Sequence, residues 1–341
     1  MVDNSIVNIF LNNAVYILTP TTRLEKPLKM SARRIKFVSY QKKPTFARLC
    51  TQKRKLHMPQ TVAKTVNVRE ILHKRAPKTN VPRLIVRYLE RIVHQNEINE
   101  YLNEFGHLNG IPFVEAAVRF LGVTIETHGL DDLPEGRYTF AGNHPLGGID
   151  GVSTGLAIHM RYPHQGIKFL SNDLLSNLEN MEPLFVPVNK IGNQSQQRSL
   201  PKRLSEAYQS EVQMVIFPAG ICSRRVNGEI TELRWQKSFI TKSVESKRAV
   251  VPVFFDGRNS NFFYNLANIR KKLGIKINVE MLYLVNEMFK QRGKSFHIYF
   301  GKPITYTTFD DSRTNQQWAD WVRMQALDLG KKINAPHGTH H

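Results

Sequence analysis

The spacing of apolar residues changes character near residue 122. Before that point, apolar side chains recur at intervals of three and four residues, which is typical of helices with one buried face. The spacing predicts helices over residues 66–74, 83–105 and 111–121, with Pro77 and Pro82 between the first two. On the second helix the predicted apolar stripe consists of Leu84, Ile85, Tyr88, Leu89 and Ile92.

After residue 122, short apolar runs alternate with helical stretches. The runs are RYTFAG, IKFLSN, LFVPV, MVIFPAG and VVPVFF, with helices predicted over 199–212 and 235–245. This alternation indicates an α/β fold, a mostly parallel central sheet flanked by helices, with an N-terminal helical extension. SFHIYFGKPI reads as a late strand and 312–333 as a closing helix, while 280–291 fits either state. In such sheets, sites form in loops at the carboxyl ends of the strands, which here include His144 and the segment 220–225.

The patterns divide the chain into four parts. Residues 1–57 form a basic arm, residues 58–110 a helical extension, residues 111–305 the α/β domain, and residues 306–341 a C-terminal helix and tail.

The arm carries half of the chain's basic excess. Residues 1–57 hold 12 Lys and Arg against Asp3 and Glu25, a net charge of +10 within a total of +20. This composition predicts a disordered segment that binds phosphates of anionic lipid or nucleic acid. Alternatively, Met58 is the natural start and the arm is not native. A non-enzymatic basic protein stays an alternative, but the chain lacks a recognised nucleic-acid module, so we do not expect a nucleic-acid partner.

The cysteine content and the hydropathy of the chain indicate in which cellular compartment the protein is expected. The two cysteines, Cys50 and Cys222, lie far apart and without metal-ligand spacing, so we expect a reducing cytoplasm and no metal site. No run approaches the roughly 18 apolar residues of a membrane span. The expected location is cytoplasmic, peripheral on the inner face of the membrane.

Four blocks occur in order between Tyr138 and Gly257: NHPLGGID, LFVPVNK, FPAGICSRR and VVPVFFDG. They resemble the motifs of the PlsC-like glycerolipid and lysophospholipid acyltransferase superfamily, to which 1-acylglycerol-3-phosphate acyltransferases belong. The resemblance implies transfer of a fatty acyl group from acyl carrier protein or coenzyme A thioester to a lysophospholipid-like acceptor at a membrane surface. The thioester is a co-substrate, and no other cofactor is implied.

The resemblance also implies roles for individual residues. His144 takes the acceptor's proton as general base, and Asp150 orients its ring and stabilises the imidazolium. The second and third blocks bind the acceptor's anionic head, and backbone amides of the third block steady the oxyanion. The implied substrate-binding residues are Asn143, Lys190, Pro218, Gly220, Ser223, Arg224 and Arg225.

The first block departs from the family's spacing. Five residues separate His144 from Asp150 where the family usually has four, and a straight helix cannot present both side chains on one face. Gly147 and Gly148 are predicted to bend the chain so that the pair meets, because glycine admits positive φ. The alternative is that Asp150 merely caps the following helix.

The third block departs as well. Ala219 stands where the family usually has Glu, and Cys222 where it usually has Arg. These changes suggest an acceptor other than lysophosphatidic acid, such as a lyso-amino-acid lipid. A separate alternative is a serine esterase, because residues 151–155 match the nucleophile elbow Gly-x-Ser-x-Gly around Ser153. An elbow needs a strand directly before it. The residues before this one, PLGGID, cannot form a central strand.

Overall fold

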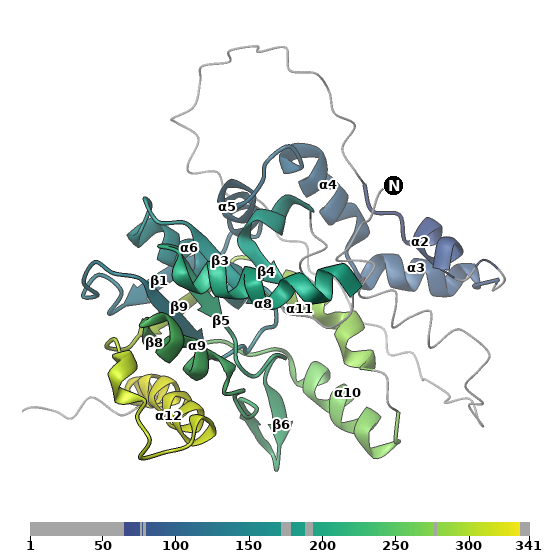
Figure 1. The fold of residues 1–341 in the computed structure, drawn as a ribbon. Coiled ribbons are helices and arrows are strands. Elements are labelled where there is room, and N and C mark those ends of the chain that lie inside the picture. Colours follow the sequence, from purple (N-terminus) through teal and green to yellow (C-terminus); the bar gives the residue numbers. More distant parts are fainter. Residues whose placement is uncertain are drawn as a thin grey trace, which may run out of the picture.

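The computed structural model describes residues 65–75, 77, 80–171, 179–187, 194–275 and 278–334. Within these residues, seven strands form one sheet (Figure 1). Its order is β1 (Thr124–His128), β9 (Ser295–Phe300), β8 (Ala249–Phe255), β2 (Tyr138–Gly142), β5 (Gln213–Ile216), β3 (Ile167–Ser171) and β4 (Phe185–Pro187). All neighbours are parallel except β8 and β9. The predicted mostly parallel sheet is confirmed.

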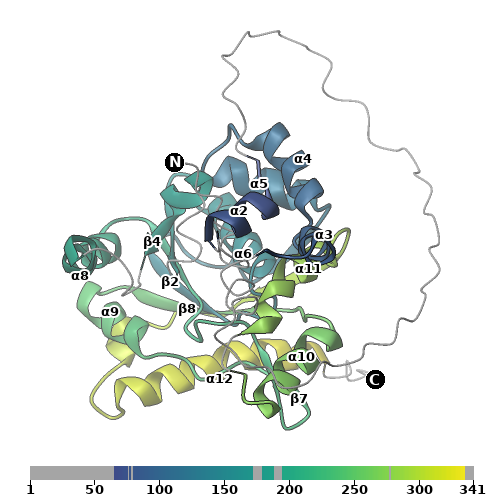
Figure 2. The ribbon, with the colours of Figure 1, turned by 90° about the vertical axis from the view of Figure 1, so that its right-hand side faces the viewer.

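Both faces of the sheet are buried, which explains the uninterrupted apolar runs of its strands. On β2, Phe140 packs in the core under α5 (Ile111–Phe120) and α6 (Ile149–Arg161). The next residue, Ala141, joins the opposite core, which includes residues of α9 (Ser238–Ser246) and α12 (Asn315–Asn334). Figure 2 shows α12 on one side of the sheet and α5 and α6 on the other.

The helix predicted over 83–105 is wrong as a single element. The chain forms α3 (Arg83–Ile92) and α4 (Gln95–Phe105), with His94 between them in the left-handed region at φ 52°. The His94 ring stacks on Phe289 at 4.2 Å, and its Nε2 lies 3.0 Å from Asn286 Oδ1. Contacts with residues nearly two hundred positions away therefore accompany a break that helical periodicity could not reveal.

The N-terminal helices pack against the segment that follows β8. Buried residues of α2 (Val68–Arg75) and α3 share a core with α10 (Asn261–Lys272), η2 (Val279–Tyr283) and α11 (Leu284–Phe289). Residues 280–289 of the ambiguous segment are helical, as parts of η2 and α11. The predicted stripe on α3 is only partly buried: Leu89 is in this core, whereas Leu84 is 79% exposed.

Several short elements were not predicted. The edge strand β1 and the hairpin of β6 (Arg224–Val226) and β7 (Glu229–Thr231) are short and mostly polar, so they show no clear hydrophobic period. The loop predicted over 220–225 is therefore wrong at its last two residues, which begin β6. The short elements η1 (Glu179–Leu184) and η3 (Tyr306–Thr308) were likewise not predicted, whereas α8 (Gln194–Gln209) overlaps the helix predicted over 199–212. In the described part of the chain, no helix has both the length and the apolar character needed to span a bilayer.

A buried arginine closes the sheet at the end opposite to the first block. Arg248, 0% exposed, donates hydrogen bonds to the carbonyls of Tyr208, Ser210, Val212 and Tyr138. Burial lowers the pKa of Arg248 to about 10, and the carbonyl oxygens solvate its charge. The end of α8 and the starts of β2, β5 and β8 are thereby joined.

Candidate active site

The Asp150 carboxylate organises the loop between β2 and α6. It is fully buried at the second residue of α6, where a negative charge is favoured by the helix dipole. Its Oδ2 accepts hydrogen bonds from the amides of Leu146 at 2.8 Å and Gly147 at 3.3 Å. Its Oδ1 accepts from Gly148 and Gly151, both at 2.9 Å. The loop thus wraps around one carboxylate.

His144 lies against this carboxylate. Its Nδ1 is 3.0 Å from Asp150 Oδ2, and its ring stacks on Phe217 with the centroids 4.5 Å apart. The side chain is 15% exposed while Nδ1 itself is buried. Nε2 is therefore the ring nitrogen left to meet a substrate.

One of the two glycines makes the bend that brings the pair together. Gly147 has φ +75°, and a Cβ there would lie 3.0 Å from Leu284 Cδ1. Gly148 has φ −170° and ψ −76°, outside the left-handed region, so the positive φ expected of it in the bend is not used. The predicted meeting of His144 and Asp150 is nevertheless confirmed, and one residue needs to be glycine for it.

The pair has complementary protonation preferences. Burial alone lowers the pKa of His144, but the charge and hydrogen bond of Asp150, together with the charge of Glu232, raise it above its ordinary value. Burial alone raises the pKa of Asp150, but His144 and the loop amides lower it below its ordinary value. Asp150 is therefore ionised at neutral pH, and it stabilises the imidazolium that forms when Nε2 takes a proton.

Asn143 does not reach the substrate side of the site. It is 5% exposed; its amide nitrogen donates to the Phe255 carbonyl at 3.0 Å, and its oxygen accepts from the Phe255 amide at 2.7 Å. Both polar functions of the side chain bind the end of β8. The expected substrate contact is corrected. Asn143 ties β2 to β8 and so fixes the position of the His144 backbone.

The third block passes directly beside His144. Pro218 is buried and its carbonyl accepts from the Gln236 amide at 3.0 Å, while Gly220 is exposed at φ +73°. The Ser223 amide donates to the His144 carbonyl at 3.0 Å. A Cβ at Gly148 or Gly220 would meet no atom within 4 Å, so open space adjoins both loops. This space is where a substrate has room to approach.

Arg224 faces inward, contrary to the expected contact with an anionic head. It is 3% exposed, and its guanidinium donates to the Cys222 carbonyl at 2.9 Å. It also lies 3.4 Å from Glu280 Oε1, and Glu280 is held in addition by Arg270 at 2.8 Å. Its guanidinium therefore has its polar partners within the protein.

Arg225 is likewise engaged by the protein. Its guanidinium donates to the side-chain oxygens of Asn265 and Asn261, both at 2.7 Å, and lies over the Tyr264 ring. All three partners belong to α10. The remaining predicted cation, Lys190, lies outside the described residues.

Glu232 is a site residue that sequence reasoning missed. It is 4% exposed; Oε1 accepts from the His144 amide at 3.3 Å, and Oε2 accepts from the Ser223 hydroxyl at 2.8 Å. Burial raises the pKa of Glu232 above its ordinary value, although the Ser223 hydroxyl opposes this. The third block lacks its usual glutamate at Ala219, and the fold brings another carboxylate against it. No local motif marks Glu232, which follows the short strand β7.

The nucleophile elbow is absent around Ser153. The residue is 0% exposed and lies inside α6, four residues after the helix begins. A loop, not a strand, leads into that helix, so the hydroxyl is not presented at a sharp strand-to-helix turn. The serine esterase alternative is wrong on this geometry.

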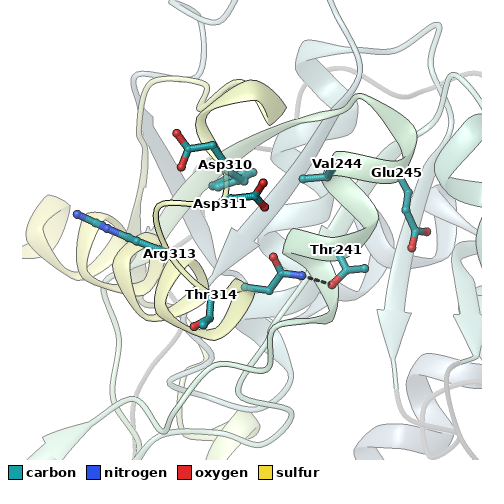
Figure 3. A pocket seen from close by; sticks show the side chains of 9 residues that line it. Thr241, Val244, Glu245, Asp310, Asp311, Arg313 and Thr314 are labelled. Atoms are coloured by element: carbon teal, nitrogen blue, oxygen red, sulfur yellow. Dashed lines mark hydrogen bonds between the residues drawn. The ribbon is translucent and has the colours of Figure 1, made fainter.

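A cavity of about 450 Å³ lies elsewhere, beside α9 and the start of α12 (Figure 3). Asn315 donates there to the Thr241 hydroxyl at 3.1 Å. Its lining is Thr241, Val244, Glu245, Phe309, Asp310, Asp311, Arg313, Thr314 and Asn315. None of the first- or third-block residues lines it, so the cavity is separate from the His144 site.

Comparison with known proteins identifies the family. A profile described as "Acyltransferase" matches residues 70–336. The chain belongs to this acyltransferase family. The resemblance found in the four blocks is thus confirmed, and the chain is an acyltransferase.

Two similar curated proteins are each described as a lyso-glycine lipid O-acyltransferase. The protein of Bacteroides thetaiotaomicron is 52% identical over 261 residues, covering 76% of this chain and 95% of that protein. The protein of Phocaeicola vulgatus is 48% identical over 261 residues, covering 76% and 92%. A solved structure, the 1-acyl-sn-glycerophosphate acyltransferase PlsC of Thermotoga maritima, matches at 14% identity and TM-score 0.40, covering 77% of this chain and 86% of that one.

The two glycines of the first block give a matched test of the loop. Gly147→Ala should lower the free energy of unfolding by about 1–3 kcal/mol, because the new Cβ is both strained at positive φ and crowded. Gly148→Ala should change it by less than about 0.5 kcal/mol, because neither condition applies. Urea unfolding of both variants measures the difference. Equal losses would contradict the bend assigned to Gly147.

Proposed function

We propose that this acyltransferase moves a fatty acyl chain from an acyl carrier protein or coenzyme A thioester to a hydroxyl group of a lyso-glycine lipid. The observation that carries the proposal is the His144–Asp150 pair at the carboxyl edge of the sheet. The acceptor is inferred from the two curated relatives, which match this chain over nearly their whole length.

In the proposed reaction, His144 acts as general base. Its Nε2 removes the acceptor's hydroxyl proton as that oxygen attacks the thioester carbonyl, and a tetrahedral intermediate forms. The intermediate collapses by breaking the carbon–sulfur bond. The leaving thiolate then takes the proton from the imidazolium, which restores neutral His144. Asp150 holds Nδ1 throughout, so the same tautomer returns after each turnover. No covalent enzyme intermediate is required.

The altered third block supports an acceptor other than lysophosphatidic acid. Arg224 and Arg225, the two arginines of the block, are engaged by Glu280 and by α10, so neither offers a free guanidinium to a phosphate. A phosphate monoester carries about −1.5 to −2 charge at neutral pH and favours arginine clamps. A glycine head offers at most one carboxylate, which needs fewer cations.

We also propose that the enzyme docks on the inner face of the membrane through α3. Leu84, Arg87, Tyr88 and Arg91 are exposed and spaced to share one face of that helix. The Tyr88 hydroxyl bonds to the Tyr283 hydroxyl. An exposed apolar face flanked by arginines is suited to an anionic lipid surface, where the acceptor resides.

The acceptor is tested by a direct competition. The purified enzyme is given isotope-labelled acyl carrier protein or coenzyme A thioester, with lyso-glycine lipid and lysophosphatidic acid of equal chain length. Mass spectrometry should show the acylated glycine lipid as the main product. His144→Ala should lower kcat by about 10²–10⁴-fold, the contribution of a general base, while the circular dichroism spectrum stays unchanged. Preferential acylation of lysophosphatidic acid, or hydrolysis of the donor alone, would refute the proposal.

The protonation of His144 predicts the pH dependence. The base works only when neutral, so kcat/KM should rise with pH through a pKa above the ordinary 6.5 and then level off. Asp150→Asn removes the charge that raises this pKa, so the rising limb should move to lower pH while kcat falls. Glu232→Gln should move the limb in the same direction. The pH profiles of kcat/KM check this, and an unmoved limb in Asp150→Asn would argue against the pair.

Docking is tested by sedimentation with lipid vesicles. Binding to vesicles containing anionic lipid should exceed binding to neutral vesicles and fall as salt rises, because the arginine contribution is screened. Leu84→Ser should lower the bound fraction. The control is Met160→Ser on α6, where a similarly exposed apolar side chain, 73% against 79%, is removed from a different helix. Equal effects of the two changes would contradict docking through α3.

A further inference from the structure

Two histidines and a glutamate meet on the β1–β9 side of the sheet, away from the His144 site. Glu126 and His128 share one face of β1 because strand side chains alternate, and the parallel register places Glu126 beside His297 of β9. On β9 the flanking residues Phe296 and Ile298 are buried in the core, so His297 faces the other side. β8 separates this pair of strands from β2 in the order of the sheet.

The three side chains lie close enough to share one metal ion, with one donor atom from each within 4.8 Å of the other two. His128 Nε2 lies 3.1 Å from His297 Nδ1. Glu126 Oε1 lies 3.6 Å from His128 Nε2, and Glu126 Oε2 lies 3.5 Å from His297 Nδ1. A zinc ion with ligands at about 2.0–2.2 Å keeps them roughly 3.3–3.5 Å apart. An ion would replace the hydrogen bond between the two rings, and one Glu126 oxygen would move toward both of them.

The two rings are held in place by packing. His128 stacks on Tyr299 with the centroids 4.4 Å apart and the planes at 9°, and His297 lies at 30° to the same ring. Tyr299 in turn packs on Phe254 of β8. Ligands whose rings are already oriented lose less conformational freedom on binding, so a site of this kind is preorganised.

We propose that Glu126, His128 and His297 form a binding site for Zn²⁺ or a similar first-row transition ion. Two imidazoles and a carboxylate suit such ions, whereas Ca²⁺ and Mg²⁺ prefer oxygen ligands alone. The histidine side chains are 37% and 39% exposed, so water can complete the coordination. The bound ion joins the edge strand β1 to β9 and stabilises the pairing of the two strands.

This site departs from the expectation that the chain holds no metal site. That expectation was based on the cysteines, and the two histidines here are 169 positions apart in sequence. Parallel pairing of two strands that are distant in sequence creates the cluster. No short-range spacing of ligand residues in the sequence therefore indicates the site.

The test uses the full chain after removal of metal with a chelator. Calorimetric titration with Zn²⁺ should show binding that His128→Ala and His297→Ala each weaken by at least about tenfold. Co²⁺ should give the visible absorption of a tetrahedral ion. The double variant, which combines His128→Ala with His297→Ala, should lose this absorption. Zn²⁺ should raise the Tm of the wild-type chain but not that of the double variant. The control is His73→Ala, which removes an exposed histidine from α2.

The outcomes separate this site from the chain's other histidines. Unchanged circular dichroism and acyl transfer in the metal-free double variant would show that the fold is intact, since these residues do not adjoin His144. Undiminished Zn²⁺ binding or an unchanged Co²⁺ spectrum in that folded variant would overturn the proposal. The absence of binding in the wild-type chain, or an equal loss in His73→Ala, would overturn it as well.

Discussion

The site depends on the burial of one carboxylate. Asp150 is fully buried, and an ionised group there is costly unless its oxygens are satisfied. Four backbone amides and the His144 ring satisfy them, and this requirement draws the segment from Leu146 to Gly148 around the charge. The interaction that shapes the loop is therefore also the one that orients the His144 ring. Packing and chemistry are not separable at this position.

Three loops at the carboxyl edge of the sheet are tied to one another around that carboxylate. Asn143 joins the end of β2 to the end of β8 through both functions of its amide. Ser223 and Glu232 join the third block to the His144 backbone. Arg224, which the family resemblance assigned to the substrate, instead neutralises the buried Glu280. Asn143, Ser223 and Glu232 thus hold the His144 backbone in position, and open space adjoins the loops at Gly148 and Gly220.

Sequence patterns predicted the features that depend on local chemistry. Apolar runs as long as a strand, separated by helical stretches, indicated a mostly parallel sheet because both faces of such a sheet are buried. The first block predicted a histidine and an aspartate brought together by a glycine bend, and Gly147 makes that bend because positive φ is open to glycine at little cost. These conclusions rest on residue type and on spacing within one segment.

Tertiary structure alone decided the features that join distant segments. The break at His94 coincides with contacts to α11, and Glu232 and Arg224 have partners from other loops or helices. β1 is short and polar and exists as a strand because β9 pairs with it, and the same pairing assembles Glu126, His128 and His297. The physical reason is that the sequence does not show whether a charged side chain faces water or a buried partner. By itself, the sequence determined the sheet, the family and the pairing of His144 with Asp150, and folding decided which charges face inward.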